Sequence, residues 1–309
     1  MALLLTPPVE GTLQTWRDGI LAEIPDLEIR LWPDVGDPAD IHYLLIGRFD
    51  LADLPELPNL RFLMPMFAGI DHLVAHPNMP DVPIVRTGPP EGDPAMTEYP
   101  VLHVLRHHRH MPDYLAQQAR KEWTVIPQKL PRNQRVGFMG FGTMAEQPAR
   151  VLHGMEFDVA AWVRKERQDK DIEMFCGPDS LSAFLGRTDI LVCLLPLTGD
   201  TEGILNTELF AQLPPGAALI NLGRGAHLVD EDLIAALDSG HLSAATLDAT
   251  KPEPLPGDSQ LWDHKRVTIM PHTARRVRPD TVGPQVATAV RLDRAGEPQL
   301  WAVDRSAGY

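Results

Sequence analysis

The sequence predicts an α/β protein of two domains, in which parallel sheets are flanked by helices. Apolar, strand-like segments alternate with helix-like segments along most of the chain, as in repeated βα units. At 309 residues the chain is also long for a single hydrophobic core. Nearly continuous apolar strands, such as Ile190–Leu195, favour a parallel sheet that is covered on both faces.

The composition is that of an ordinary globular protein, and its charge excludes several classes of partner. A formal net charge of −14 argues against nucleic-acid and anionic membrane surfaces as partners. No apolar run approaches the roughly 20 residues of a membrane span, and Met1–Pro8 lacks the basic flank of a signal peptide. Cys176 and Cys193 lie in apolar, strand-like runs and are expected to be buried free thiols rather than a disulfide. We therefore expect a cytoplasmic protein.

The first 90 or so residues are expected to form one α/β unit. Its predicted strands are Ala2–Leu5, Leu27–Trp32, Ile41–Ile46, Leu60–Met66 and Val82–Arg86, with a helix over Glu10–Glu23. The segment Thr87–Pro94 is rich in glycine and proline and indicates a boundary. One long helix is expected from Pro94 to about Lys121.

The second unit is predicted to alternate strands and helices regularly. A short apolar strand is expected from Arg135 up to the glycines that follow it, and the further expected strands are Asp158–Val163, Glu173–Cys176, Asp189–Leu195, Ala217–Leu222, Leu242–Ala249 and Val267–Met270. Its expected helices are Thr143–His153, Asp179–Leu185, Asn206–Leu213 and Glu231–Leu237, and a final helix covers Asp280–Ala295.

A glycine-rich turn lies between the strand at Arg135 and the helix at Thr143. Gly140-x-Gly142-x-x-Ala145 fits the dinucleotide-binding fingerprint in its proper context. The first glycine allows the tight turn, the second lets the backbone approach a pyrophosphate, and the small third residue lets helix and strand pack closely. Glycines also end strands for purely structural reasons, but this context favours a dinucleotide held at the helix start.

The next strand indicates which dinucleotide binds. An NAD site would place Asp or Glu about 20 residues beyond the glycines, to hold the ribose 2′-hydroxyl. Here Arg164 and Lys165 end the strand, and their charges attract a 2′-phosphate. NADPH is therefore expected, with NADH weaker. The alternative is a solvated charge run, since Glu166 and Asp169 dilute the patch.

Four predicted strand ends carry polar or charged residues, and the carboxyl ends of parallel strands meet at one edge of a sheet. The four segments are Leu195–Thr198, Asn221–Gly225, Asp248–Glu253 and Pro271–Thr273. They bring an arginine, two carboxylates and a histidine to that edge.

Several motifs in the same order resemble the D-isomer-specific 2-hydroxyacid dehydrogenases, and within them the glyoxylate/hydroxypyruvate reductase A branch. The motifs are Gly137-x-x-Gly140-x-Gly142, Arg224-Gly225, Leu247–Pro256 and Pro271-His272, with further similarity at Gly88–Tyr99, Leu233–Gly240, Pro254–Trp262 and Val303–Tyr309. The resemblance runs nearly end to end and is strongest from residue 130 to 275.

The resemblance implies two Rossmann-like or flavodoxin-like domains and a homodimer. The substrate-binding domain would comprise residues 1–95 and 278–309, and the NADP-binding domain residues 96–277. The implied catalytic set is Arg224, Glu253 and His272. In this chemistry His272 is the general acid, Glu253 orients it and favours imidazolium, and Arg224 holds the substrate carboxylate.

The resemblance also implies binding residues around this set. The expected cofactor contacts are Gly140, Gly142, Thr143, Met144, Arg164, Lys165, Leu195, Pro196, Thr201, Leu222, Gly223, Asp248 and Ala274. The expected substrate contacts are Ala68, Gly69 and Arg224. Arg48, which follows the strand Ile41–Ile46, is a further expected contact, with an ordinary exposed arginine as the alternative. Phe67, Arg275 and Arg278 depart from the pattern of the branch and leave the shape of the pocket open.

The expected function is the NADPH-dependent reduction of a short 2-oxo acid, glyoxylate to glycolate or hydroxypyruvate to D-glycerate. One alternative is the same chemistry on a bulkier 2-oxo acid. Another is a redox-sensing binding protein, although a sensor has no need of a proton donor. The histidines at 103, 107, 108 and 110 suggest a metal, but hydride transfer requires none, and a packed or solvated helix face is the preferred interpretation.

Overall fold

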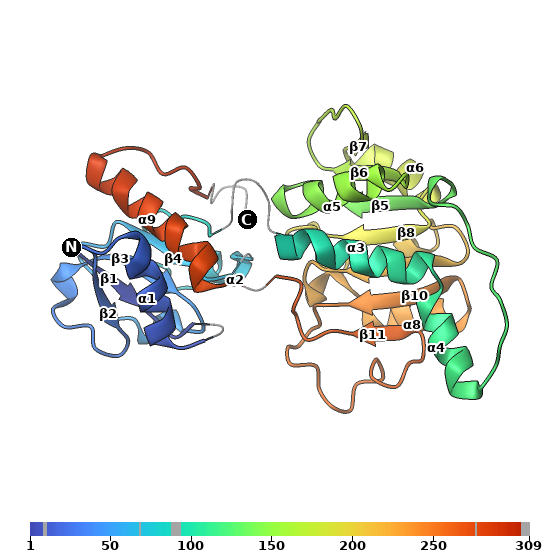
Figure 1. The fold of residues 1–309 in the computed structure, drawn as a ribbon, viewed down its shortest axis with the longest axis horizontal. Helices are drawn as coiled ribbons and strands as arrows, with labels where there is room; N and C mark the ends of the chain where they lie inside the picture. Colours follow the sequence, from blue (N-terminus) through green and yellow to red (C-terminus); the bar gives the residue numbers. More distant parts are fainter. Residues whose placement is uncertain (9–10, 68, 88–93, 276, 304–309) are drawn as a thin grey trace. The chain divides into compact units, whose positions relative to one another are not determined.

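The computed structural model describes residues 1–8, 11–67, 69–87, 94–275 and 277–303. The chain divides into two compact units, Met1–Pro90 with Arg276–Tyr309, and Glu91–Arg275. Both units contain a parallel sheet flanked by helices, which confirms the predicted fold class (Figure 1). Among the described residues, no helix is long and apolar enough to cross a membrane.

The first unit has a four-stranded parallel sheet in the order β2-β1-β3-β4, which is the flavodoxin-like order. Its elements are β1 (Ala2–Leu5), α1 (Leu13–Glu23), β2 (Glu28–Leu31), β3 (Ile41–Ile46), β4 (Phe62–Pro65), α2 (Asp71–Val74) and α9 (Pro279–Ala295), with 3₁₀ turns at Pro38–Asp40 and Leu51–Asp53. Helices α1 and α9 pack on one face, where Trp16 and Val286 join the core beneath Leu3.

Two expectations for this unit need correction. Helix α1 begins at Leu13 instead of Glu10, because the Thr12 side chain caps it by accepting a hydrogen bond from the Thr15 amide. The segment 82–86 forms only isolated bridges, in which Ile84 pairs with Leu63 and Val85 pairs with Ala302.

The second unit has a seven-stranded sheet in the order β11-β10-β9-β8-β5-β6-β7, and every neighbouring pair is parallel. Its strands are β5 (Arg135–Met139), β6 (Asp158–Val163), β7 (Glu173–Cys176), β8 (Ile190–Cys193), β9 (Ala217–Asn221), β10 (Leu242–Leu247) and β11 (Val267–Ile269). From β7 to β10 the strands follow the Rossmann order, and β11 extends it by one strand.

Helices cover both faces of this sheet (Figure 1). They are α3 (Pro94–His108), α5 (Thr143–Gly154), α6 (Leu181–Gly186), α7 (Thr207–Phe210) and α8 (Asp230–Asp238), with 3₁₀ turns at Pro131–Asn133, Pro178–Ser180 and Gly225–His227. Helix α4 (Met111–Arg120) follows α3, and none of its residues is buried. Val104 of α3 and Leu152 of α5 pack with Phe138 on one face. Phe184 of α6 and Leu233 of α8 pack with Leu191 on the other.

The prediction of one helix from Pro94 to Lys121 is wrong, because the chain breaks between α3 and α4. His110 has a left-handed backbone, with a φ of 55°, and α4 begins at Met111. Pro112 explains the break: in a continuous helix it could not donate to the carbonyl of His108 and its ring would clash with that carbonyl, whereas a proline fits the first turn of a new helix. Helix α7 is also shorter than predicted and ends at Phe210.

Both cysteines are free, but only one of them is fully buried. Cys193 lies inside the sheet, and burial raises the pKa of its thiol to about 12. Cys176 is half-buried at the end of β7, so the expectation of two buried thiols is wrong for this residue.

Candidate active site

The carboxyl ends of the parallel strands of the second unit share one edge of the sheet, and the predicted site residues follow them. The glycine turn follows β5, Arg164 follows β6, Pro196 follows β8, Arg224 follows β9, Asp248 follows β10 and His272 follows β11. The strand before each of these residues therefore places it at this edge of the sheet.

The turn after β5 has the geometry of a phosphate-binding loop. Gly140 has a φ of 94°, and a Cβ at this position would lie 2.9 Å from the carbonyl oxygen of Leu194, so only glycine fits. A Cβ at Gly142, in contrast, would meet no heavy atom within 4 Å. The amides of Thr143 and Met144 open helix α5 ahead of its first intrahelical hydrogen bonds. This combination fits the pyrophosphate of a dinucleotide.

His272 and Glu253 form the ion pair of the site. The ring Nδ1 lies 2.9 Å from Glu253 Oε2 and 3.1 Å from Oε1. The hydrogen bond and charge of Glu253 raise the pKa of His272, although burial opposes the change. Burial favours the neutral form of Glu253 as well, but the contact with His272 outweighs it and the pKa of Glu253 is lowered. The pair therefore favours an imidazolium beside a carboxylate.

The turn that carries His272 is strained and is held by Asp248. His272 has a φ of 51°, which is uncommon for a residue other than glycine. The buried Asp248 carboxylate accepts hydrogen bonds from the amides of Thr273 (2.8 Å) and Ala274 (3.0 Å). Tyr99 of α3 donates its hydroxyl to the same carboxylate at 2.7 Å. These donors fix the backbone on the C-terminal side of the histidine.

Arg224 is held by the loop that follows β9. The buried Asn221 donates its side-chain amide to the Arg224 carbonyl at 3.0 Å. The Arg224 amide donates to Nδ1 of the buried His227 at 3.0 Å. Arg224 also lies near enough to affect the pKa of both Glu253 and His272. The arginine, the carboxylate and the histidine are therefore close together.

The loop after β8 is tied to the same region. The Thr201 hydroxyl donates to the Pro196 carbonyl at 2.7 Å and accepts from the Thr198 amide at 2.8 Å. Because Nδ1 of His227 is an acceptor, its Nε2 donates to the Pro196 carbonyl, at 3.3 Å. His227 thus joins the loops of Pro196 and Arg224. The other expected cofactor contacts here include the buried Leu222, Gly223 and Ala274, and the partly exposed Leu195.

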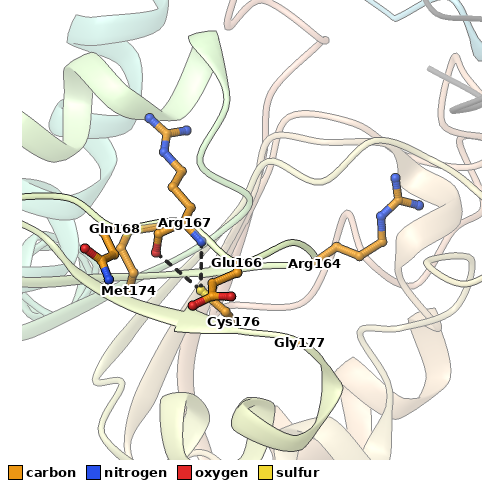
Figure 2. Close-up of a pocket in the computed structure, with 7 residues that line it drawn as sticks. All are labelled: Arg164, Glu166, Arg167, Gln168, Met174, Cys176 and Gly177. Carbon is orange, nitrogen blue, oxygen red and sulfur yellow. Dashed lines mark hydrogen bonds between the residues drawn. The ribbon is translucent and has the colours of Figure 1, made fainter.

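A hollow of about 520 Å³ lies at the ends of β6 and β7. Its lining residues are Arg164, Glu166, Arg167, Gln168, Met174, Cys176 and Gly177. Figure 2 shows the side chains of Arg164 and Arg167 leaving the loop in different directions. Arg164 and Lys165 are both exposed. The hollow and these two cations lie where the sequence predicts the 2′-phosphate.

The family of the chain follows from its sequence as well as from this geometry. A sequence model of the D-isomer specific 2-hydroxyacid dehydrogenase NAD binding domain matches residues 101–274. The chain belongs to the D-isomer specific 2-hydroxyacid dehydrogenase family. The predicted resemblance is confirmed, and the protein is an NAD(P)-dependent oxidoreductase.

Solved structures of the family resemble the whole chain. A D-isomer specific 2-hydroxyacid dehydrogenase from Xanthobacter autotrophicus Py2, in complex with NADPH and MES, is 35% identical, with a TM-score of 0.95 over 100% of this chain and 99% of that one. An NADPH-dependent glyoxylate/hydroxypyruvate reductase from Sinorhizobium meliloti, in complex with NADP and sulfate, is 31% identical, with a TM-score of 0.92 over 100% of both chains. A probable 2-hydroxyacid dehydrogenase from Rhizobium etli CFN 42, in complex with NADP, HEPES and L(+)-tartaric acid, is 30% identical, with a TM-score of 0.90 over 100% of this chain and 99% of that one.

The expected substrate residues of the first unit follow its strands. Arg48 is exposed after β3, and Gly69 follows β4, whereas Ala68 lies outside the described residues. The Phe67 ring packs against the His72 ring, with 4.8 Å between centroids. Arg278 forms an ion pair with Asp280 at 2.8 Å, which holds its guanidinium at the start of α9.

The histidines of α3 pack against the sheet. His103 is buried, which lowers its pKa to about 4, and His107 Nε2 lies 2.9 Å from the Thr246 hydroxyl, with its pKa lowered by burial to about 3. Both imidazoles are therefore neutral near pH 7. No group of three metal-binding side chains occurs among the described residues.

Sequence reasoning assigned no role to four residues that shape the site, namely Tyr99, Asn221, His227 and Arg167. Asn221 could have been singled out from the sequence, since it is a polar residue at the end of an otherwise apolar strand. Tyr99 and His227 act on loops far away in the sequence, so no local pattern reveals them.

Proposed function

We propose that the protein reduces a short 2-oxo acid with NADPH, glyoxylate to glycolate or hydroxypyruvate to D-glycerate, and that His272 is the general acid. The observation that carries the proposal is the His272–Glu253 ion pair, with 2.9 Å between Nδ1 and Oε2. The pair lies at the carboxyl edge of the sheet in a chain that belongs to the family and also has the glycine turn. The S. meliloti glyoxylate/hydroxypyruvate reductase, 31% identical over the whole chain, supports the choice of substrate.

The side chains have the properties that this reduction requires. NADPH, when bound, supplies the hydride that reduces the substrate carbonyl carbon. Glu253 accepts from Nδ1 of His272, so Nε2 is the nitrogen that donates a proton to the carbonyl oxygen. The Arg224 guanidinium matches the substrate carboxylate with its planar pair of N–H groups. The products are the 2-hydroxy acid and NADP⁺.

The preference for NADPH rests on Arg164 and Lys165, two exposed cations at the end of β6. A carboxylate at that point would repel a 2′-phosphate, whereas these cations attract it. The NADPH or NADP in three related structures supports the same cofactor. The proposed cofactor contacts are Gly140, Gly142, Thr143, Met144, Arg164, Lys165, Leu195, Pro196, Thr201, Leu222, Gly223, Asp248 and Ala274.

The assignment of the dinucleotide to one domain and of the substrate to the other is also a proposal. Residues 96–277 would bind the dinucleotide, and residues 1–95 with 278–309 would bind the substrate. In the latter, Arg48, Ala68 and Gly69 are the proposed substrate contacts, with Arg224 from the dinucleotide domain. The flavodoxin-like strand order of the first unit supports a ligand at the carboxyl ends of its strands, where Arg48 and Gly69 follow β3 and β4.

A spectrophotometric scan of 2-oxo acids with NADPH and NADH tests the function. We expect oxidation of NADPH with glyoxylate and hydroxypyruvate, and weaker rates with NADH. Turnover of bulkier 2-oxo acids alone would replace the proposed substrates. Binding of NADPH without turnover of any 2-oxo acid would point to a sensor and reject the enzyme.

A substitution tests the general acid. His272→Ala should lower kcat for reduction by about 10²–10⁴-fold, because the positioned proton donor is lost. The dissociation constant of NADPH should stay unchanged. An undiminished kcat would overturn the role of His272.

We also propose a homodimer, supported by exposed apolar side chains on α4 and the segment after it. Met111, Leu115, Trp123, Val125 and Leu130 are all at least 45% exposed, and Trp123 is 98% exposed. Such a cluster is typical of a protein–protein interface. Sedimentation of the wild type should give a dimer and Trp123→Ser should weaken it; a monomeric wild type would reject the proposal. The cytoplasmic location stays a prediction.

A further inference from the structure

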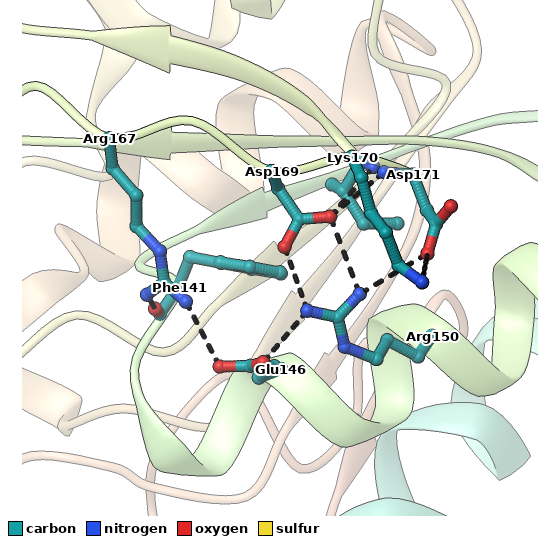
Figure 3. A network of polar contacts seen from close by, with 8 residues as sticks. Phe141, Glu146, Arg150, Arg167, Asp169, Lys170 and Asp171 are labelled. Atoms are coloured by element: carbon teal, nitrogen blue, oxygen red, sulfur yellow. Dashed lines mark hydrogen bonds and ion pairs between the residues drawn. The ribbon is translucent and has the colours of Figure 1, made fainter.

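The loop between β6 and β7 is fastened to helix α5 by two arginines (Figure 3). Arg167, in the loop, donates to Glu146 Oε2 at 3.0 Å. Arg150, on α5, donates to Glu146 Oε1 at 2.8 Å and to Asp169 Oδ2 at 2.7 Å. We refer to Arg167, Glu146, Arg150 and Asp169 as the clamp. Its charges alternate in sign, so each carboxylate is compensated by a guanidinium.

Arg167 also binds the glycine turn itself. Its Nη1 donates to the carbonyl of Phe141, the residue between Gly140 and Gly142. The guanidinium lies over the Phe141 ring, 4.7 Å from its centroid. One side chain thus connects the phosphate-binding turn to the loop that carries Arg164.

Asp169 fixes the other end of this loop. Its Oδ1 accepts from the amides of Asp171 (3.0 Å) and Ile172 (3.1 Å), which closes the turn before β7. The Arg150 contact and these amides lower the pKa of Asp169 to about 2, so the carboxylate is ionised at every ordinary pH. Asp169, one of the two acidic residues that dilute the basic patch in the sequence, is therefore neutralised by Arg150.

We propose that Arg167 and Arg150 are positioning residues for the phosphates of the cofactor, because they neutralise Glu146 and Asp169 and join the glycine turn to the loop of Arg164. This inference rests on the proposed function, since it names the residues that prepare the NADPH site. Arg164 and Lys165 contact the 2′-phosphate in that site, whereas the clamp acts through Phe141 and Glu146.

The position of Glu146 gives the physical reason. It lies in the first turn of α5, beside the amides that face a pyrophosphate. Without Arg167 the clamp keeps two carboxylates and one guanidinium, since Arg150 is shared by Glu146 and Asp169, and the uncompensated negative charge beside these amides repels the phosphates. The loss of that compensation affects every dinucleotide that has a pyrophosphate, with or without a 2′-phosphate. Loss of Arg164 affects only the 2′-phosphate.

The test measures dissociation constants of NADPH and NADH by fluorescence titration. Arg167→Met should weaken both by about tenfold, as about 1.4 kcal/mol of lost compensation would do. The ratio of the two constants should stay near that of the wild type. Arg164→Met should instead weaken the binding of NADPH alone and so raise the ratio of the NADPH constant to the NADH constant. Lys170→Met, which removes the same charge from the same loop, should change neither constant, because Lys170 pairs with Asp171 at 3.7 Å and its side chain forms no ion pair with a member of the clamp among the described residues.

A second substitution separates charge compensation from damage to the fold. Glu146→Gln removes the carboxylate that Arg167 neutralises, so the double variant Arg167→Met/Glu146→Gln should regain most of the affinity. A purely structural role of Arg167 predicts no such recovery. Wild-type affinity of Arg167→Met for both cofactors, or no recovery in the double variant, would overturn the proposal.

Cys176 reports the position of the loop without any cofactor. Its Sγ accepts from the Arg167 amide at 3.4 Å, and Cys193 is fully buried, so iodoacetamide should label Cys176 selectively. Labelling should be several-fold faster in Arg167→Met than in the wild type or Lys170→Met. Equal rates would show that the clamp does not hold the loop. If the wild type bound neither dinucleotide, the proposed function would fail, whatever the labelling rates.

Discussion

Replacing Gly225 by alanine should separate two loops of the candidate site that the structure holds in direct backbone contact. A Cβ on Gly225 would lie 2.0 Å from the carbonyl carbon of Thr250, 2.2 Å from its oxygen and 2.5 Å from the amide nitrogen of Lys251. To bring the nearest contact to 3.0 Å, the loops must separate by about 1 Å. Only backbone atoms are involved, so no side chain can rotate out of the way.

This separation would act on two members of the proposed catalytic set. Arg224 immediately precedes Gly225, and the Thr250 amide donates to Glu253 Oε1 at 3.1 Å. A misplacement of about 1 Å in a positioned site costs on the order of 10²-fold in rate. Overpacking of this kind also costs about 1–3 kcal/mol of unfolding free energy. We therefore expect Gly225→Ala to lower kcat about a hundredfold and to lower Tm by roughly 2–10 °C.

The assay compares kcat and thermal unfolding of Gly225→Ala with those of Gly186→Ala. Gly186 ends α6, and a Cβ there would meet no heavy atom within 4 Å, so this control should behave as the wild type. The rates are measured well below Tm, where both variants are folded. Wild-type kcat and Tm in Gly225→Ala would refute the close approach on which the reasoning depends.

Two further substitutions test the surroundings of His272. Because Glu253 raises the pKa of His272, kcat/KM for reduction should fall only as the pH rises through this raised pKa. Glu253→Gln should move that fall to lower pH, and an unchanged pH profile would contradict the pairing of His272 with Glu253. The raised pKa of His272 also stabilises the folded protein. This stabilisation is present below the unfolded pKa of about 6.5 and is lost as the pH rises through the folded pKa. Tyr99→Phe removes the donor to the buried Asp248 and should lower the unfolding free energy by about 1.5–3 kcal/mol in denaturant titrations. The Tyr114 hydroxyl accepts from the Ile126 amide, which is neutral, so Tyr114→Phe should lower the unfolding free energy by less than Tyr99→Phe. Equal losses of unfolding free energy in the two variants would argue against the importance of the charged acceptor Asp248.

The strands could be predicted well because each is marked by its own residues. The predicted bounds of β1, β3, β6 and β7 are those of the structure. Buried parallel strands are apolar on both faces, and polar or glycine residues end them abruptly. Helix ends were less predictable, since a capping side chain at Thr12 and a proline at 112 moved boundaries that the apolar pattern left open.

The members of the candidate site could be predicted from the sequence, but the residues that hold those members in position could not. Arg224, Glu253 and His272 stand in recognisable motifs at strand ends, and the order of the strands brings them to one edge. The cation pair Arg164 and Lys165 was also visible. Arg167 lies in the same charged stretch of sequence, yet it binds Phe141 and Glu146 across 26 and 21 residues of sequence.

The sequence by itself determined the fold class, the family and the residue types at the sheet edge, because periodicity and short motifs are local properties of the chain. Only the tertiary structure decided which charges compensate one another. It showed that Asp248 accepts hydrogen bonds from the turn of His272, that a glycine at 225 is needed for the close contact with Thr250, and that Arg150 neutralises Asp169. The physical reason is that these interactions depend on distances of about 3 Å between segments far apart in sequence, which are set only when the sheet has assembled.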